Sequence, residues 1–242
     1  MAVKIGSARI DENGNAKNGK AGDQTGKEVS TQNWYKHSKG WRVFRAKNAV
    51  LADLIADDME YACLNSNIGY DQNQRGTLYT VAKPFQFNCK KVNKKCECDC
   101  SSLVRVCCAY AGIMLPNFRT SNEASTLLQS GYFTEMKGKQ FTDSSDYLMR
   151  GDILVTKTQG HTVIVLDNGS KVGENLKGYL RVTANAVNVR TEPKKGTEIL
   201  GVVHKGDELE YKGIASNGSW YETRYNGRIA YITLKYTEFV PE

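Results

Sequence analysis

The chain has 242 residues, which is long enough for one large domain or two modest ones. Its apolar content of 40% is typical of a globular protein, and its apolar runs are too short to cross a membrane, so we expect no membrane insertion. The net charge of +7 fits attraction to an anionic polymer or simple solubility, and without an RNA-binding, helix-turn-helix or zinc-finger pattern we expect no nucleic-acid partner.

The amino-terminal part of the chain predicts short strands followed by one amphipathic helix. Residues 1–45 are polar and glycine-rich, a composition that favours turns and short strands. The first residues lack the apolar core of a signal peptide, so we expect the protein to begin in the cytosol. Residues 46–65 place apolar side chains at helical spacing, and we expect this helix to pack on a sheet. An aromatic patch that we interpret as the edge of a core precedes it: Trp34, Tyr35, Trp41, Val43 and Phe44.

The run 97–104 carries the main chemical signal. Polar residues give way here to an apolar, helix-spaced segment that we expect to be helical over 101–112. Cys100 therefore lies at a helix N-terminus, where free N–H groups and the positive end of the dipole favour thiolate over thiol. The thiolate is the attacking species in cysteine catalysis. Because the carboxylate of Asp99 would raise the thiol pKa, we expect this side chain to turn away and bond backbone N–H groups.

Beyond this helix the sequence predicts a short helix and two strands. Residues 121–130 suggest the helix, with Ser121 as its N-cap. The strands are expected at 151–155 and 161–166. The dipeptide at 168–169, Asn-Gly, predicts a tight turn from which a third strand returns.

A thiol nucleophile needs a base within hydrogen-bond reach, and histidine is the usual one. The chain has three histidines. His37 lies in the polar amino-terminal stretch and His204 lies in a turn near the carboxy terminus, whereas His161 opens a predicted strand. If the turn at 168–169 forms, Glu174 lies on the same sheet face as His161 and could fix the imidazole tautomer, although a one-residue slip would exchange it for Asn175.

The residue pattern of the sequence changes at about residues 176–180. From there short β-branched runs alternate with turns every eight to twelve residues, which predicts a small all-β barrel. We therefore expect a domain over 1–176 and a second over 180–242. The aromatic residues of the second domain fit either a ligand groove or the barrel core.

Two resemblances add to this reading of the first domain. Asp99-Cys100-Ser101 resembles the signature of the NlpC/P60 and CHAP cell-wall hydrolases, which are papain-like, and 151–154 and 160–165 resemble two of their strands. The resemblance implies an α+β fold in which the cysteine-bearing helix packs on an antiparallel sheet. It implies cleavage of a peptidoglycan amide by Cys100 with His161 as base, without a cofactor. It also points to Tyr70 and Asp99 near the oxyanion site and to Glu174 as the third catalytic group.

The second domain resembles a bacterial SH3 (SH3b) domain in the order and spacing of five segments: 186–191, 199–203, 206–209, 219–225 and 227–232. Such a domain implies binding to peptidoglycan, for which Trp220, Tyr221 and Tyr225 are the candidates. The whole chain then resembles a monomeric phage endolysin, made in the host cytoplasm and acting on the wall after release.

Two other hypotheses remain open at this stage. The sulfur atoms of Cys89, Cys96, Cys98 and Cys100 could hold a structural zinc ion, although their spacing lacks the usual Cys-x-x-Cys knuckle. Alternatively, the first domain could be inert and the protein only a wall-binding module. Cys107 and Cys108 lie within the apolar helix and are best interpreted as small buried hydrophobes.

Overall fold

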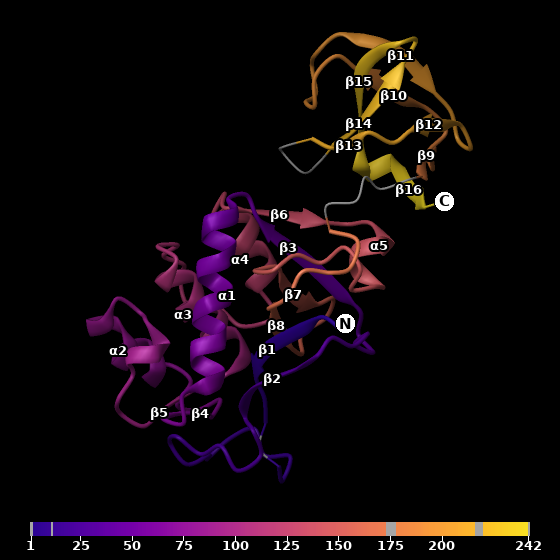
Figure 1. Cartoon of the computed structure of the whole chain (residues 1–242). Coiled ribbons are helices and arrows are strands. Elements are labelled where there is room, and N and C mark those ends of the chain that lie inside the picture. Colours follow the sequence, from indigo (N-terminus) through magenta and orange to yellow (C-terminus); the bar gives the residue numbers. More distant parts are fainter. Residues whose placement is uncertain (1, 11, 173–177, 216–219, 242) are drawn as a thin grey trace. The chain divides into compact units, whose positions relative to one another are not determined.

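A computed structural model describes residues 2–10, 12–172, 178–215 and 220–241. The chain divides into two compact units, which we describe separately. The amino-terminal unit contains residues 1–135 and 141–172, and the carboxy-terminal unit contains the remainder. Figure 1 shows helices and a sheet in the first unit and strands in the second, which confirms the predicted α+β class.

The amino-terminal unit is built on a six-stranded sheet in which each neighbouring pair from β2 to β3 is antiparallel. The two strands expected near the candidate base form within two residues of their predicted bounds. The spatial order is β2 (Val29–Asn33), β1 (Lys4–Ala8), β8 (Thr162–Val165), β7 (Ile153–Thr156), β3 (Trp41–Ala46) and β6 (Phe133–Met136). A short parallel pair, β4 (Ile68–Tyr70) and β5 (Cys96–Cys98), lies outside this sheet.

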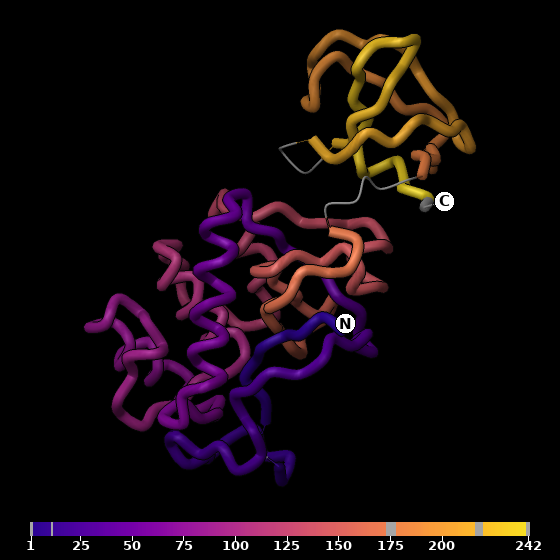
Figure 2. The backbone as a smooth tube through the Cα atoms, in the orientation of Figure 1, coloured from indigo at the N-terminus to yellow at the C-terminus, as the bar shows by residue number. Residues whose placement is uncertain are grey.

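The predicted hairpin after residue 168 is wrong. Strand β8 has β7 on one side and β1 on the other, where Ile5 pairs with Val165, so no edge is left for a returning strand. The N–H of Gly169 instead donates to the carbonyl oxygen of Leu148 at 2.8 Å. Strand β1, from the start of the chain, therefore takes the place beside β8, and Figure 2 shows this amino-terminal segment passing through the first unit.

The main helices form where the apolar periodicity predicts them. Helix α1 (Ala49–Leu64) begins after Asn48, whose side-chain oxygen accepts from the N–H of Val50 at 2.8 Å. Helix α3 (Cys100–Tyr110) packs against α1, and both contact β1 and β8. None of the helices in the described ranges is long and apolar enough to cross a membrane.

Helix α4 (Glu123–Gln129) begins two residues later than its predicted cap. Asn122 holds the N-cap position in place of Ser121, and its side-chain oxygen accepts from the N–H of Arg119 at 2.8 Å. The remaining helices are short: α2 (Thr77–Ala82), α5 (Lys139–Thr142), and 3₁₀ turns at Lys83–Phe85, Cys89–Lys91 and Leu234–Tyr236.

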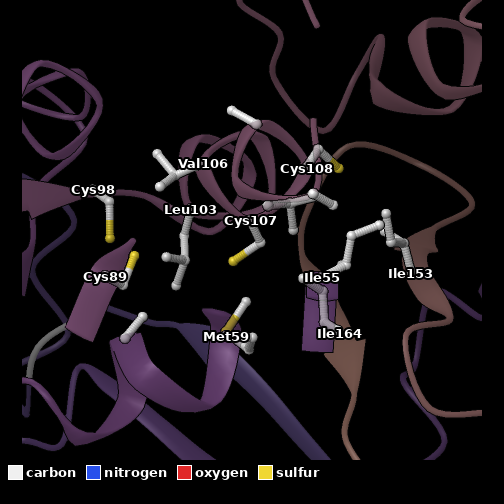
Figure 3. Close-up of a cluster of buried hydrophobic side chains, with 14 of the residues drawn as sticks. Ile55, Met59, Cys89, Cys98, Leu103, Val106, Cys107, Cys108, Ile153 and Ile164 are labelled. Carbon is white, nitrogen blue, oxygen red and sulfur yellow. The ribbon is translucent and has the colours of Figure 1, made fainter. Parts of the chain in front are cut away.

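Cysteines form part of the core between the helices and the sheet. Figure 3 shows Cys89, Cys98 and Cys107 among apolar side chains, and both Cys107 and Cys108 are fully buried. The prediction that the last two act as small hydrophobes is therefore confirmed. Burial raises the pKa of these thiols well above the ordinary range, so they are neutral packing groups.

The carboxy-terminal unit is a small β structure made of two sheets around an apolar core. Asn226 and Gly227 both have positive φ angles and form the two-residue turn that joins β14 to β15. The five-stranded sheet is ordered β11 (Ile199–Val203), β10 (Val187–Arg190), β15 (Arg228–Thr233), β14 (Trp220–Tyr225) and β13 (Gly213–Ile214). The three-stranded sheet is ordered β12 (Glu208–Glu210), β9 (Gly178–Val182) and β16 (Thr237–Pro241).

Candidate active site

Helix α3 begins at the candidate nucleophile, and a capping box fixes its first turn. Asp99 is the N-cap, and its side chain accepts from the N–H of Ser102 at 2.7 Å. The Ser102 hydroxyl in turn accepts from the N–H of Asp99 at 2.9 Å. The expectation that the Asp99 carboxylate bonds backbone N–H groups is therefore confirmed, and Cys100 is the first helical residue.

A buried arginine neutralises the carboxylate at this cap. Arg75 donates from Nε to Oδ2 of Asp99 at 2.5 Å and from Nη2 to Oδ1 at 3.1 Å. The two side chains are only 8% and 7% exposed. The same guanidinium donates to the Ser101 hydroxyl and to the carbonyl oxygen of Phe118. Arg75 therefore ties the start of α3 to the loop that follows this helix.

The Cys100 thiol lies against the start of strand β8. The backbone N–H groups of Thr162 and Ser101 act to lower the thiol pKa, which favours the thiolate. Burial outweighs them and raises the thiol pKa, and the charges of Asp99 and Glu123 act in the same direction. The expectation that the helix start favours a resting thiolate is therefore wrong, because Cys100 is buried, with only 8% of the residue exposed.

His161 immediately precedes strand β8, which contacts helix α3. Its imidazole is half-buried, and burial lowers its pKa to about 4, with smaller contributions from the positive charges of His37 and Arg9. The ring is therefore neutral at physiological pH. A neutral imidazole is the protonation state that a general base needs.

The amino-terminal stretch contributes an aromatic cluster whose member His37 influences His161 electrostatically. The ring of His37 lies 5.1 Å from that of Trp41 and 5.9 Å from that of Tyr35. Burial raises the pKa of Tyr35, the positive charge of Arg9 acts in the opposite direction, and a Cys100 thiolate would raise it further. The aromatic patch of the sequence thus borders the candidate site.

A buried carboxyl group contacts the start of the same strand. Glu123, at the start of α4, is fully buried and accepts from the Thr162 hydroxyl at 2.8 Å. Its second oxygen has no hydrogen-bond partner among the described residues. Burial raises its pKa well above the ordinary range. The Thr162 side chain therefore links Glu123 to the start of strand β8.

Tyr70 approaches the thiol from strand β4. It is 6% exposed, and its hydroxyl oxygen accepts from Nε2 of Gln72 at 3.0 Å. Burial raises its pKa, and negative charge on Cys100 would raise it further, so the phenol is near the sulfur and stays protonated. No acceptor for the Tyr70 hydroxyl proton is found within the described ranges.

A pocket of about 310 Å³ opens onto Cys100. One wall comes from the start of α3 and another from Gln159 and Gly160, directly before His161. The Gly160 N–H donates to the Thr120 hydroxyl at 3.3 Å and closes the rim between these loops. Glu174, the predicted third catalytic group, and Asn175 lie outside the described residues, so their roles stay predictions.

The four cysteines of the zinc hypothesis do not converge. The thiol of Cys96 lies 3.7 Å from the carbonyl oxygen of Asn67, and that of Cys98 lies 3.5 Å from that of Gly69. Within the described ranges, no three His, Cys, Asp or Glu side chains are grouped so as to hold a metal ion. The zinc hypothesis therefore has no ligand set in this part of the chain.

The candidate wall-binding aromatics differ in exposure. Tyr221 is 2% exposed and packs edge-on against Tyr211 with ring centroids 5.8 Å apart, and Trp220 is 8% exposed. Both rings are therefore mostly core, which is the alternative that the sequence left open. Tyr225 is half-buried and has more surface to offer. Binding by any of the three stays a prediction.

Comparisons with known families agree with this architecture. A family described as an endolysin-like domain matches residues 5–172, and a bacterial SH3 domain matches residues 185–238. The comparison with curated proteins found no match. The fold, the site and these matches define a cell-wall-acting protein with a hydrolase-like domain followed by an SH3 domain. Because the first match spans more than half of the chain, the chain belongs to the endolysin-like domain family.

Four residues near the site escaped the sequence analysis: Arg75, Glu123, Tyr35 and His37. The first two stand alone in polar or short helical segments, and nothing in their local pattern indicates burial. Tyr35 belongs to the aromatic patch, which was interpreted as a core edge, and His37 was placed in the polar amino-terminal stretch. Only long-range pairing of the strands brings them to Cys100.

Proposed function

We propose that this protein is a peptidoglycan hydrolase that cuts an amide bond of the wall peptides, with Cys100 as nucleophile and His161 as general base. The observation that carries the proposal is the pocket that opens onto Cys100 and has Gln159 and Gly160 in its wall. This pocket joins the start of helix α3 to the segment directly before His161. Membership of the endolysin-like family supports the substrate class.

The proposed reaction starts from a neutral thiol and a neutral imidazole. The raised thiol pKa and the lowered imidazole pKa both disfavour a resting ion pair. As the sulfur attacks the amide carbon, the thiol proton passes to the imidazole and the carbonyl oxygen takes up negative charge. The imidazolium then protonates the leaving amine as the carbon–nitrogen bond breaks. Water, deprotonated by the same imidazole, hydrolyses the thioester and frees the thiol.

We expect hydrogen-bond donors at the start of α3 to stabilise the negatively charged oxygen that forms during attack. The backbone N–H of Cys100 belongs to the first helical turn, where N–H groups have no partner within the helix. The Tyr70 hydroxyl, near the sulfur, is a second candidate donor. Asp99 acts differently: its bonds to Ser102 and Arg75 hold the helix start in place.

The proposal extends to the second domain and to the biological setting. An SH3 domain of the bacterial type is suited to hold the enzyme on peptidoglycan, with Tyr225 as the more accessible of the three candidate rings. The family and the two-domain order favour a phage endolysin that reaches the wall after release from the host cytoplasm. We also predict that the protein acts as a monomer.

Loss of turbidity in a suspension of purified sacculi tests the hydrolase. Wild-type protein should clear the suspension, Cys100→Ala should not, and Cys108→Ala, a buried thiol on the same helix, should retain activity. Iodoacetamide should inactivate the wild type. Mass spectrometry of the released fragments then identifies the bond that is cut. Full activity of Cys100→Ala would refute the mechanism, and binding of sacculi without release of fragments would leave a wall-binding module.

A further inference from the structure

A second, larger pocket adjoins the one that opens onto Cys100. Its volume is about 590 Å³, and the two pockets share Gln72 and Arg119 in their walls. Three arginines line it, Arg75, Arg105 and Arg119, and its other lining residues are all uncharged. A ligand that spans both pockets would therefore pass from the candidate nucleophile into a cationic chamber.

The three guanidinium groups are not equivalent. The guanidinium of Arg75 already has partners, because it pairs with Asp99 and also donates to the side-chain oxygen of Asn117 at 2.8 Å. Arg105 is positioned by its Nε bond to a backbone carbonyl at 3.0 Å, and it lies 3.8 Å from the ring centroid of Tyr79. It forms no ion pair among the described residues. Its charge is therefore fixed in place but not neutralised.

Arg119 stands at the boundary between the two pockets. Its side chain is exposed and has no hydrogen-bond or ion-pair partner within the described ranges, although its backbone N–H is held by Asn122 at 2.8 Å. The backbone is thus anchored while the guanidinium is free. Together with Arg105 it gives the pocket two uncompensated positive charges within reach of the reaction centre.

We propose that this pocket is a specificity subsite that binds a free carboxylate of the substrate peptide, with Arg119 as its main ligand. The inference rests on the proposed hydrolase function. The planar guanidinium fork matches a carboxylate in two parallel hydrogen bonds, and an amide in the same place would offer one acceptor and no charge. Wall peptides differ in whether side carboxylates are free or amidated, so such a subsite would select between substrates.

Hydrogen bonds to charged groups contribute roughly tenfold to hundredfold in binding, and the exposed position of Arg119 argues for the lower end. Two synthetic wall peptides that differ only in one free carboxylate or its carboxamide measure this directly. With full-length wild-type protein, kcat/KM should be about tenfold higher for the carboxylate peptide. Arg119→Gln should bring the ratio of the two values close to one, and Arg119→Lys should give an intermediate ratio.

Lys94→Gln is the matched control, because it removes one exposed positive charge from the same unit outside both pockets. It should leave the ratio unchanged. An Arg119→Gln ratio equal to that of wild type would overturn the proposal, and so would a wild type that does not distinguish the peptides. Loss of the preference in Lys94→Gln as well would show a general charge effect and would also overturn it.

A binding measurement separates this inference from the hydrolase proposal. Calorimetric titration of Cys100→Ala with the two peptides should show tighter binding of the carboxylate form, and Cys100→Ala/Arg119→Gln should lose that preference. Selective binding without turnover in wild type would refute the hydrolase and keep the subsite. Turnover without selectivity in either assay would keep the hydrolase and refute the subsite.

Discussion

The buried ion pair between Arg75 and Asp99 gives the sharpest prediction for stability. Arg75→Met removes the cation and leaves the carboxylate 7% exposed, without a counter-charge. Breaking a buried pair from one side costs about 3–5 kcal/mol. The carboxylate keeps its bonds from the Ser102 N–H and the Ser101 hydroxyl, so we expect the lower end, about 3 kcal/mol.

This loss of stability should appear as a large decrease in the Tm of the amino-terminal unit. In a unit of this size, 1 kcal/mol lowers Tm by about 2–4 °C, so Arg75→Met should lower the transition of the amino-terminal unit by roughly 6–12 °C. Activity should fall as well, because the pair holds the first turn that carries Cys100. Differential scanning calorimetry of the full chain, together with the turbidity assay, measures both.

A double-mutant cycle identifies the cause. Asp99→Asn keeps an oxygen for the Ser102 N–H but removes the buried negative charge, so Arg75→Met/Asp99→Asn should be clearly more stable than the sum of the single effects predicts. Arg119→Met is the surface control and should shift Tm little. Additive effects, or an Arg75→Met protein within about 1 kcal/mol of wild type, would show that the pair is not a buried electrostatic unit.

Three further predictions follow from burial and backbone geometry. Burial raises the pKa of Asp58 from 3.8 to about 7, so the folded protein keeps a proton that the unfolded chain releases near pH 4. The free energy of unfolding should therefore fall by roughly 4 kcal/mol at most as the pH rises from about 4 to about 7. Urea titrations should show that Asp58→Asn loses this pH dependence, and a pH dependence equal to that of wild type would contradict the shift. Since burial lowers the pKa of His161 to about 4, the acid limb of the pH profile of kcat/KM should lie near that pH. His37→Gln should move this limb upward, because it removes a positive charge that lowers the His161 pKa. An acid limb near about pH 6.5 in wild type would show that His161 is not in this buried environment. Gly151 has a φ of +85°, and an added Cβ would lie 2.3 Å from a backbone oxygen of α1. Gly151→Ala should therefore be at least about 2 kcal/mol less stable than Gly112→Ala, where φ is +82° and no atom lies within 4 Å of the added Cβ. Equal losses of stability would mean that only the positive φ matters and that the steric clash at Gly151 does not.

Local pattern by itself determined much of the secondary structure. Apolar spacing placed helix α1 and the two strands around His161, and the change from polar to apolar residues placed Cys100 at a helix start. The regular turns after residue 178 indicated the β barrel. These features depend on propensity, periodicity and capping over a few residues, which the sequence displays directly.

Long-range pairing decided the rest. The turn at 168–169 has strong local propensity, but β1 takes the free edge of β8, so the hairpin does not form. The Cys100 thiol has the helix start that favours ionisation, yet burial reverses the direction of its pKa shift. The sequence alone therefore determined most of the helices and strands and predicted Cys100 and His161 as the catalytic residues. Only the tertiary structure decided their neighbours and protonation states, because burial and charge pairing depend on segments far apart in the chain.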